Sequence, residues 1–462
     1  MTISSFSDLD ILPALLENLV SLNYQQMTDI QARSLPDMLA GLDVLARART
    51  GSGKTAAFGL ALLNRLDMKH FAVQALVLCP TRELADQVAN EIRKLARSIP
   101  NIKVLTLCGG VARGPQLESL HHGAHIIVGT PGRILDHLQG GQLRVHQLKT
   151  LVLDEADRML DMGFSEQLDA IVKQLPAKRQ NLLFSATYPA NMQTMAKRIS
   201  PDARMISAEH DHDADTIEQR FYRTDNAEQR LQAVKLLLLQ HRPQTAIVFC
   251  NTRQQTKELV EKLSQAGFSA QALHGDLEQR ERDQTLICFA NHSISVLVAT
   301  DVAARGIDIK QLDMVINYQL AHDTDSHTHR IGRTGRAGNS GIACTLIDHG
   351  DTEKLALLSN DNSLHIDPQP LPPTSLLRKP PEPAPMRTIQ IDGGKKQKLR
   401  AGDIVGALTA EGDIDFTAIG KIQLNDRHAF VAIQRELADT AIKKLSDRKM
   451  KGRSFRVRML YK

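Results

Sequence analysis

Short, almost unbroken apolar runs recur through most of the chain, and they restrict the possible fold more than any other feature. They read "QALVLCP", "AHIIVGT", "KTLVLDE" and "QNLLFSA" before residue 200, and "TAIVFCN", "ISVLVAT", "DMVINYQ" and "GIACTLI" after it. Because apolar and polar residues do not alternate in these runs, each predicts a strand that is buried on both faces, as in parallel sheets covered by helices. Eight such strands are too many for one small sheet and predict more than one α/β domain.

The two halves of this region also resemble each other. "ALVLCPTRELADQVANEIRKL" from Ala75 and "AIVFCNTRQQTKELVEKLSQ" from Ala246 share the order apolar strand, Cys, Thr-Arg, helix. This order suggests a duplicated α/β domain whose strand-to-helix loops face one cleft. Thr-Arg after a strand can also be an ordinary helix start, so the similarity alone leaves both interpretations open.

Composition changes along the chain indicate the domain boundaries. The polar segment "AEHDHDADTIEQ" (208–219) predicts a flexible joint, and eight of the 18 prolines lie between Pro368 and Pro385, which predicts a partly extended linker. From Arg387 onward there are 17 Lys and Arg against 9 Asp and Glu, so this last segment is basic. The predicted divisions are 1–207, 208–365, a linker at 366–386, and a basic module at 387–462.

Composition also excludes several classes of protein. With 42% hydrophobic and 24% charged residues, the 462-residue chain is globular rather than disordered. No apolar stretch approaches the roughly 20 residues of a spanning helix, and the N-terminus lacks the pattern of a secretory signal. The five cysteines are scattered singly, which predicts buried thiols in a reducing compartment rather than disulfides or zinc sites. We therefore expect a cytoplasmic protein that does not enter a membrane.

Two motifs predict a nucleotide site. "ARTGSGKT" (48–55) follows an apolar stretch and supplies Gly51, Gly53, Lys54 and Thr55, the residue types that cradle phosphates and hold magnesium. "LVLDEAD" ends a second apolar strand with Asp154, suited to magnesium, and Glu155, suited to activating water. Each motif alone could be a Gly-rich turn or a helix cap. Together they predict hydrolysis of a nucleoside triphosphate.

The order of the remaining motifs closely resembles that of the DEAD-box RNA helicases, which are named for the string Asp154-Glu155-Ala156-Asp157. "PTRELA", Gly109-Gly110, "TPGR" and "SAT" lie in the first half, and "FCNTR", "ATDVAARGID" and "HRIGRTGR" lie in the second. Family members begin the phosphate loop with Ala, as at Ala48. The resemblance covers residues 1 to about 365 and implies two tandem RecA-like domains, with ATP and Mg²⁺ as cofactors and RNA as partner.

The same resemblance implies roles for individual residues. It assigns catalysis to Lys54, Asp154, Glu155 and the arginine fingers Arg333 and Arg336, with magnesium held by Thr55 and Asp154 largely through water. It assigns ATP binding to Phe6, Thr28, Gln31, Gly51, Ser52, Gly53, Lys54, Thr55, Gly306 and Asp308. Burial in an N-terminal helix is the alternative for Phe6. Asp157, Ser185, Thr187 and His329 are implied to couple the ATP and RNA sites. The implied RNA groove comprises Thr81, Arg82, Gly109, Gly110, Thr130, Gly132, Arg133, Thr252, Arg253, Gln279, Arg282 and Thr300.

The basic module predicts a small α+β domain. Its pattern of strand, helix, two strands, helix and strand is the βαββαβ order of the RNA recognition motif. The positions that usually stack bases are poorly filled, because Gln390 and Ile433 replace aromatic residues beside His428 and Phe430. RNA could instead use another face or the basic edges. These edges contain Lys443, Lys444, Arg448, Lys449, Lys451, Arg453, Arg456 and Arg458.

The core, the Pro-rich segment and this RRM-like tail together look like the DbpA-type subfamily of these helicases. That resemblance implies a tail that binds a hairpin of 23S ribosomal RNA, and a core that remodels nearby RNA during large-subunit assembly. We expect a monomer. The alternatives are a general RNA remodeller whose tail adds non-specific affinity, and an ATP-gated RNA clamp that does not unwind.

Overall fold

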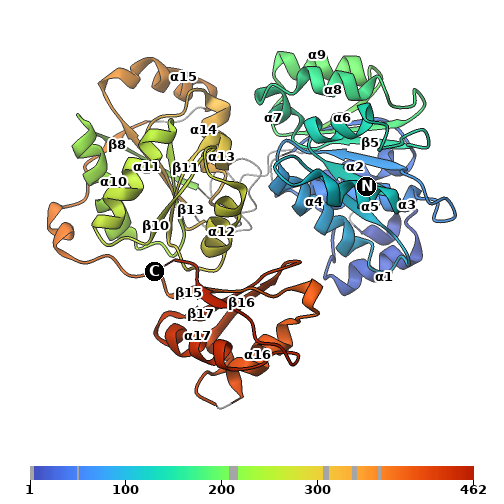
Figure 1. Cartoon of the computed structure of the whole chain (residues 1–462). Helices are drawn as coiled ribbons and strands as arrows, with labels where there is room; N and C mark the ends of the chain where they lie inside the picture. Colours follow the sequence, from blue (N-terminus) through green and yellow to red (C-terminus); the bar gives the residue numbers. More distant parts are fainter. Residues whose placement is uncertain are drawn as a thin grey trace. The chain divides into compact units, whose positions relative to one another are not determined.

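The structure is a computed structural model that describes residues 5–48, 51–207, 217–304, 312–335, 341–362, 366–410 and 412–461. These residues belong to two compact units, the first ending at 207 and the second beginning at 217 (Figure 1). Gly306, Asp308 and Arg336, which the sequence assigns to the ATP site, lie outside the described residues, as does most of the predicted joint at 208–219.

The first unit is built on a seven-stranded sheet with the order β3-β4-β2-β5-β6-β1-β7. Its strands are β1 (Val44–Arg47), β2 (Ala75–Leu78), β3 (Val104–Leu107), β4 (Ile126–Gly129), β5 (Thr150–Leu153), β6 (Gln180–Ser185) and β7 (Arg204–Ser207). All neighbours pair in parallel. The parallel, doubly covered sheet predicted from the unbroken apolar runs is confirmed.

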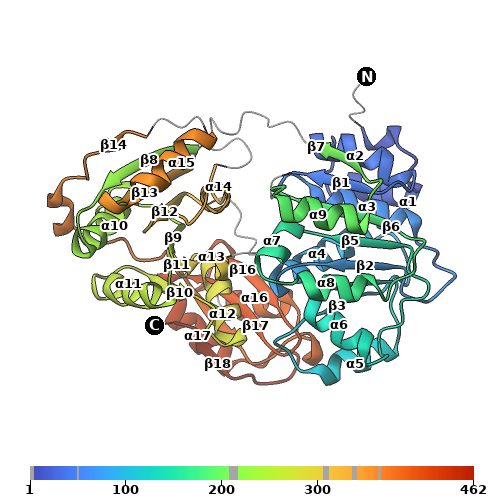
Figure 2. The same ribbon diagram turned by 90° about the horizontal axis from the view of Figure 1, so that it is seen from above.

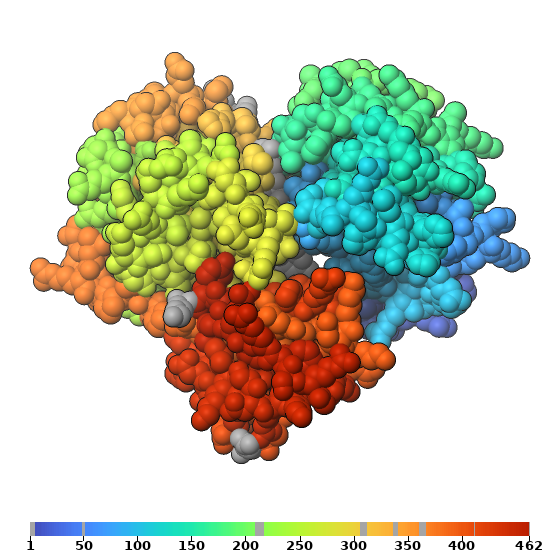
Figure 3. All heavy atoms as spheres, in the orientation of Figure 1, coloured from blue at the N-terminus to red at the C-terminus, as the bar shows by residue number. Residues whose placement is uncertain are grey.

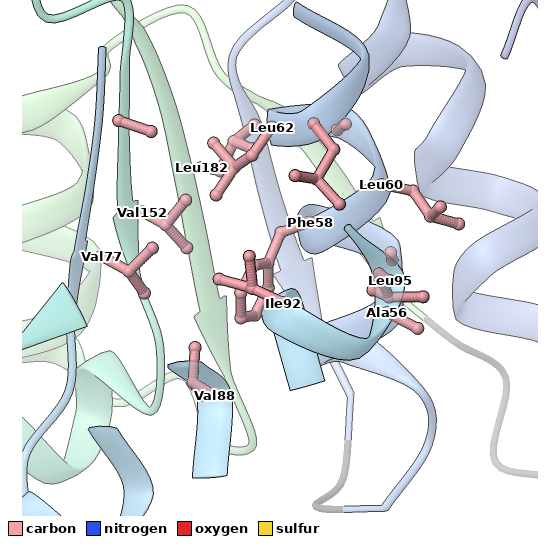
Figure 4. Packing of buried hydrophobic residues seen from close by; sticks show 14 of the residues in the cluster. Ala56, Phe58, Leu60, Leu62, Val77, Val88, Ile92, Leu95, Val152 and Leu182 are labelled. Atoms are coloured by element: carbon pink, nitrogen blue, oxygen red, sulfur yellow. The ribbon is translucent and has the colours of Figure 1, made fainter. Parts of the chain in front are cut away.

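Helices cover both faces of this sheet. They are α1 (Pro13–Ser21), α2 (Asp29–Leu39), α3 (Lys54–Arg65), α4 (Arg82–Leu95), α5 (Arg113–His121), α6 (Pro131–Gln139), α7 (Ala156–Asp161), α8 (Ser165–Val172) and α9 (Ala190–Ile199), preceded by the short η1 (Phe6–Asp8). One apolar core joins α1 to α4 to the sheet, and a second joins α6 to α9 to the other face (Figure 1). In the first core, Phe58 of α3 packs beside Ile92 of α4, facing strand residues such as Leu182 (Figure 4).

The second unit repeats the same topology. Its order β10-β11-β9-β12-β13-β8-β14 corresponds position by position to the first sheet, and its strands also pair in parallel. The strands are β8 (Ile217–Arg223), β9 (Ala246–Cys250), β10 (Ala270–Leu273), β11 (Val296–Thr300), β12 (Met314–Asn317), β13 (Gly341–Ile347) and β14 (Pro368–Gln369). The predicted duplication is therefore confirmed. Ile217, Glu218 and Gln219, predicted to lie in the joint, instead begin β8, because they pair with the buried strand β13.

Helices again lie on both faces of this second sheet (Figure 2). They are α10 (Ala227–His241), α11 (Arg253–Gln265), α12 (Gln279–Ala290), α13 (Asp301–Ala304), α14 (Thr324–Ile331) and α15 (Thr352–Asn362), with the short η3 (His349–Asp351) and η4 (Thr374–Arg378). α10 and α11 pack on one core, while Leu358 of α15 packs on Phe221 at the opposite face. All five cysteines are buried, as predicted, and burial raises the pKa of the Cys250 thiol to about 12.

The C-terminal domain has the predicted βαββαβ order. It comprises β15 (Met386–Ile391), η5 (Lys395–Gln397), α16 (Ala401–Thr409), η6 (Phe416–Ala418), β16 (Ile419–Leu424), β17 (Ala429–Gln434), η7 (Arg435–Leu437), α17 (Ala438–Asp447) and β18 (Val457–Met459). The antiparallel sheet has the order β16-β17-β15-β18, and α16 and α17 cover one face of it. Among the described residues of the whole chain, no helix is long and apolar enough to cross a membrane.

Candidate nucleotide and RNA site

The predicted catalytic motifs follow three neighbouring strands of the first sheet. The phosphate loop follows β1, Asp154 follows β5, and Ser185 ends β6. Since β5, β6 and β1 are adjacent and parallel, their carboxyl ends lie at one edge of the sheet, where α/β folds bind ligands. Thus the fold brings the motifs together although more than 100 residues separate the first from the last.

The phosphate loop leads directly into α3. Gly51 and Gly53 have φ angles of 90° and 94°, a region that glycine enters without strain. Lys54 begins α3, is buried, and donates from Nζ to the carbonyl of Ala48 at 2.9 Å. Ala48 itself is buried in the first core, so a small apolar side chain is accommodated where other phosphate loops have Gly. Backbone N–H groups at this helix start can bind phosphate oxygens.

The adenine-reading motif is attached to this loop. The Gln31 side chain accepts from Thr28 N at 2.9 Å and donates to Gly53 O at 3.1 Å, completing a capping box at the start of α2. A Cβ on Gly53 would lie 2.5 Å from Gln31 Nε2. Glycine at 53 is therefore required for both its φ angle and this close approach. Phe6 is buried in the first core and contacts Tyr24 edge-on, with ring centroids 6.3 Å apart. This packing agrees with the alternative that Phe6 is a buried residue of the N-terminal region.

The two carboxylates at the end of β5 have different surroundings. Asp154 is only 3% exposed, and its buried Oδ1 accepts no hydrogen bond among the described residues. Burial raises the pKa of Asp154 to about 7, opposed by Lys54 and reinforced by Glu155. An orphaned carboxylate oxygen beside a phosphate loop fits a divalent cation that prefers oxygen ligands. Glu155 has φ 52° and ψ 52°, a strained conformation for a non-glycine residue and one that functional sites often contain.

Asp157 connects the carboxylate motif to the end of β6. Its Oδ2 accepts hydrogen bonds from Ala186 N at 3.2 Å and from both the N and Oγ1 of Thr187 at 2.9 Å. Ser185 Oγ donates to Thr187 O at 2.6 Å. These hydrogen bonds tie the carboxylate motif directly to the end of β6, and the coupling role of Asp157, Ser185 and Thr187 stays a prediction.

The predicted RNA residues of the first unit gather at the starts of two helices. Thr81 caps α4 by accepting from Leu84 N at 3.3 Å, with Arg82 as the first helical residue. Thr130 caps α6 at the backbone level and its Oγ1 accepts from Gly109 N at 3.3 Å. An ideal Cβ at Gly109 or at Gly132 would meet no atom within 4 Å, and Gly110 has φ 73°. Arg133 Nη2 donates to Val111 O at 3.2 Å. The cluster offers hydroxyl, guanidinium and backbone N–H groups.

The second unit repeats this arrangement. Thr252 caps α11 by accepting from Gln255 N at 3.2 Å, as Thr81 does for α4, and Arg253 is again the first helical residue and pairs with Asp276. Arg282 of α12 donates to Ala303 O at 2.7 Å, which places it beside α13, the short helix that follows Thr300. Gln279 starts α12, and its Nε2 donates to Asp283 at 2.8 Å. His329 lies in the last turn of α14, and Arg333, 8% exposed, lies two residues after the end of that helix.

Arg330 is a buried residue of the "HRIGRTGR" motif to which the sequence analysis assigned no role. Its guanidinium is 1% exposed and donates from Nε and Nη2 to both oxygens of Asp301 at 2.6 and 2.7 Å. It also donates to Asn251 Oδ1 at 2.7 Å and Gln319 O at 2.8 Å, and lies 5.3 Å from the Phe249 ring centroid. Arg330 thus connects α14 to the ends of three strands. The sequence feature that could have indicated Arg330 is its position in "HRIGRTGR", between the predicted coupling residue His329 and the predicted arginine finger Arg333.

Replacing Arg330 by Gln should lower the free energy of unfolding of the second unit by about 3–5 kcal/mol, because it leaves a largely buried carboxylate at Asp301 without its partner. Urea denaturation of the full chain measures this change in the free energy of unfolding.

Exchange of the exposed Arg378 for Gln is the matched control and should not shift the urea transition. Adding Asp301→Asn to Arg330→Gln should restore much of the loss. An unchanged transition for Arg330→Gln alone would contradict the structural role.

Comparison with known proteins places these motifs in a family. Residues 28–195 match the DEAD/DEAH box helicase profile, 229–338 the helicase conserved C-terminal domain, and 388–459 the DbpA RNA binding domain. Over 458 residues the chain is 50% identical to the ATP-dependent RNA helicase DbpA of Escherichia coli K12, covering 99% of this chain and all of that protein. It is 40% identical to the DEAD-box ATP-dependent RNA helicase CshA of Geobacillus kaustophilus, over 74% of this chain and 73% of CshA.

Solved structures agree with these sequence matches. Saccharomyces cerevisiae Dbp5 bound to RNA and ADP BeF3 is 32% identical, with a TM-score of 0.72 over 80% of this chain and 96% of that one. The chain therefore belongs to the DEAD-box ATP-dependent RNA helicases. Within that family it is of the DbpA type, with an RNA-binding domain after the helicase core.

Proposed function

We propose that this helicase remodels 23S ribosomal RNA during assembly of the large ribosomal subunit, in the cytoplasm and as a monomer, and that its C-terminal domain selects the RNA. The supporting observation is the C-terminal domain itself: residues 388–459 match the DbpA RNA binding domain, in a chain alignable end to end with a DbpA. The match to CshA covers only 74% of this chain, whereas the match to DbpA covers 99% of it.

In the proposed mechanism the core residues carry out ATP hydrolysis. Gln31 reads the adenine, since an amide both donates and accepts, and Phe6 stacks on it or supports the motif from the core. Gly51, Ser52, Gly53 and Lys54 bind the phosphates. Mg²⁺, held through Thr55 and Asp154, would offset phosphate charge when bound. Glu155 takes a proton from the attacking water, whose oxygen displaces ADP from the γ-phosphorus.

In this proposal, residues of the second domain complete the ATP site. Arg333 and Arg336 reach the γ-phosphate when the domains close, and Gly306 and Asp308 meet the ribose. Guanidinium forks suit the charge that spreads over the transferring phosphoryl group. Asp157, Ser185, Thr187 and His329 then link hydrolysis to the RNA groove. Because the fingers come from the other domain, hydrolysis depends on closure.

The groove residues cannot choose among RNA sequences. Backbone N–H groups, hydroxyls and arginines contact phosphates and 2′-hydroxyls, which every RNA offers. Selection must therefore come from outside the core. The surplus of basic residues in the tail supports this assignment, although a general remodeller or an ATP-gated clamp with a non-specific tail would share it.

Removing residues 387–462 should preserve RNA-stimulated ATPase activity but abolish preference among RNAs. The measurement compares half-maximal activation by a 23S fragment carrying the peptidyl-transferase hairpin and by unstructured RNA of equal mass. We expect the truncated protein to need similar amounts of both. If the truncated protein still prefers the fragment, the core carries the selectivity and the proposed role of the tail is wrong.

A further inference from the structure

The outer face of the C-terminal sheet carries buried polar side chains. Ile389 and Ile391 of β15 point into the domain core, so Thr388 and Gln390 point to the opposite face. Thr388 is nevertheless 2% exposed and Gln390 1% exposed. Phe430, which pairs with Gln390 across the sheet, is 4% exposed and lies outside the domain core. Something other than this domain's own helices covers the face.

The covering element is α12 and the loop after it, from the second core domain. Thr388 Oγ1 accepts a hydrogen bond from Asn291 Nδ2 at 3.2 Å and forms another with Ser293 Oγ at 2.7 Å, in which either hydroxyl can donate. Gln284 Nε2 donates to Gln390 Oε1 at 3.1 Å, and Thr285 Oγ1 lies 3.2 Å from the Tyr461 hydroxyl. In Figure 3 the dark red end of the chain meets the yellow atoms of α12. These hydrogen bonds join side chains of the two domains in a buried layer, and Gln390 is also held by Asp392 and Arg458 of its own domain.

The Pro-rich segment at 366–386 makes a second set of contacts between the same two domains. Its β14 pairs with β8, and Arg242 at the end of α10 forms a 2.7 Å ion pair with Glu382. Ala384 N donates to Ser269 Oγ at 3.3 Å, while Arg435 of the C-terminal domain donates from N to Pro385 O at 3.0 Å. The predicted linker at 366–386 is therefore packed against the second core domain over much of its length.

We propose that the C-terminal domain is a fixed extension of the second core domain, and that its sheet face is a permanent intramolecular interface rather than a platform for single-stranded RNA. Of the positions that would stack bases, Gln390 and Phe430 are buried, Ile433 packs in the domain core, and His428 is partly exposed. RNA selected by the tail must then contact its remaining surface, where Lys443, Lys449 and Arg453 are exposed. The selected RNA would move with the domain that carries the arginine fingers.

A distance measurement tests the docking independently of any RNA. All five native cysteines are buried, so spin labels on Gln265→Cys in α11 and Glu436→Cys in η7, both exposed positions, attach selectively. We expect one narrow distance distribution that stays the same when RNA and a non-hydrolysable ATP analogue are added. A broad distribution, or one that shifts with these ligands, would overturn the proposal.

Two substitutions, one on each side of the interface, test whether docking of the C-terminal domain is needed for the bound RNA to stimulate the ATPase. This test rests on the function proposed above. Thr388→Glu and Ser293→Glu each place a carboxylate in the polar layer, and Thr440→Glu on the exposed side of α17 is the matched control. Both interface variants should broaden the distance distribution. They should bind the 23S fragment as the intact chain does but lose up to about 10²-fold in its stimulation of the ATPase, because the bound RNA is no longer held against the core.

The outcomes separate the two proposals. Full stimulation by the fragment in variants with a broadened distribution would contradict the functional role of the docked position while leaving RNA selection by the tail intact. A lack of preference for the fragment in the unmodified chain would contradict the 23S assignment, while a narrow distance would still support docking. Ser293 lies outside the C-terminal domain, so its variant cannot act by unfolding that domain.

Discussion

Replacement of Glu155 by Gln should lower the RNA-stimulated turnover number for ATP by about 10²–10⁴-fold, the contribution typical of a general base. ATP and RNA should still bind, because the amide has almost the shape of the carboxylate and Lys54 and the phosphate loop are unchanged. Measured turnover at saturating ATP and RNA, together with ATP binding followed by a fluorescent analogue, gives both quantities.

The matched control is Glu166→Gln, the same chemical change at an exposed position of α8. It should turn over ATP at the rate of the unmodified protein. If Glu155→Gln also does so, Glu155 is not the base, and the strained backbone at this residue needs another explanation.

Replacement of Arg333 by Lys should reduce turnover by about 10³-fold or more, since arginine fingers contribute about 10³–10⁵ in rate and an ammonium cannot offer the planar fork. The charge is kept, so RNA affinity in the absence of ATP should change little. Steady-state ATPase kinetics and RNA titrations of the same preparation test both parts.

Arg378→Lys makes the same exchange at an exposed residue in η4, beyond the helicase profile match. It should leave turnover intact. Equal turnover by the Arg333 and Arg378 variants would remove Arg333 from the catalytic machinery and leave its burial as a purely structural feature.

The sequence predicted the central strands but not the sheet edges. β2, β5, β9 and β12 are buried on both faces, so nearly every residue in them is apolar and the pattern is clear. β7 reads "RMIS" and is largely exposed, and β10 reads "AQAL" with only its first and last residues buried, so neither has an unbroken apolar run. Edge strands are positioned by pairing with a neighbour, and the local sequence carries little of that information.

The candidate site was predictable where chemistry dictates residue types. Glycines at positive φ, a lysine at a helix start and a carboxylate at a strand end leave local signals, so the phosphate loop and Asp154 could be proposed as site residues from the sequence. Arg330 could not, because its partners Asp301, Asn251 and Gln319 are brought together only by the order of the strands. Tertiary contacts of this kind have no fixed spacing in the sequence.

The linker shows the same limit. Eight prolines correctly indicate a segment without regular helix, but proline content does not say whether an extended segment is free or packed. Here packing is decided by distant groups such as Ser269 and Arg242. Likewise Gln390 marked a poor base-stacking platform, while its burial under α12 could be learned only from the fold.

The most direct test of the central claim is the ATPase rate of the intact protein at saturating Mg-ATP, titrated with equal masses of two RNAs. One is a 23S fragment that carries the peptidyl-transferase hairpin, and the other is unstructured RNA. A helicase directed by its tail should be activated by much lower amounts of the fragment. Equal activation by both RNAs would contradict that account and make the tail a non-specific tether on a general RNA helicase.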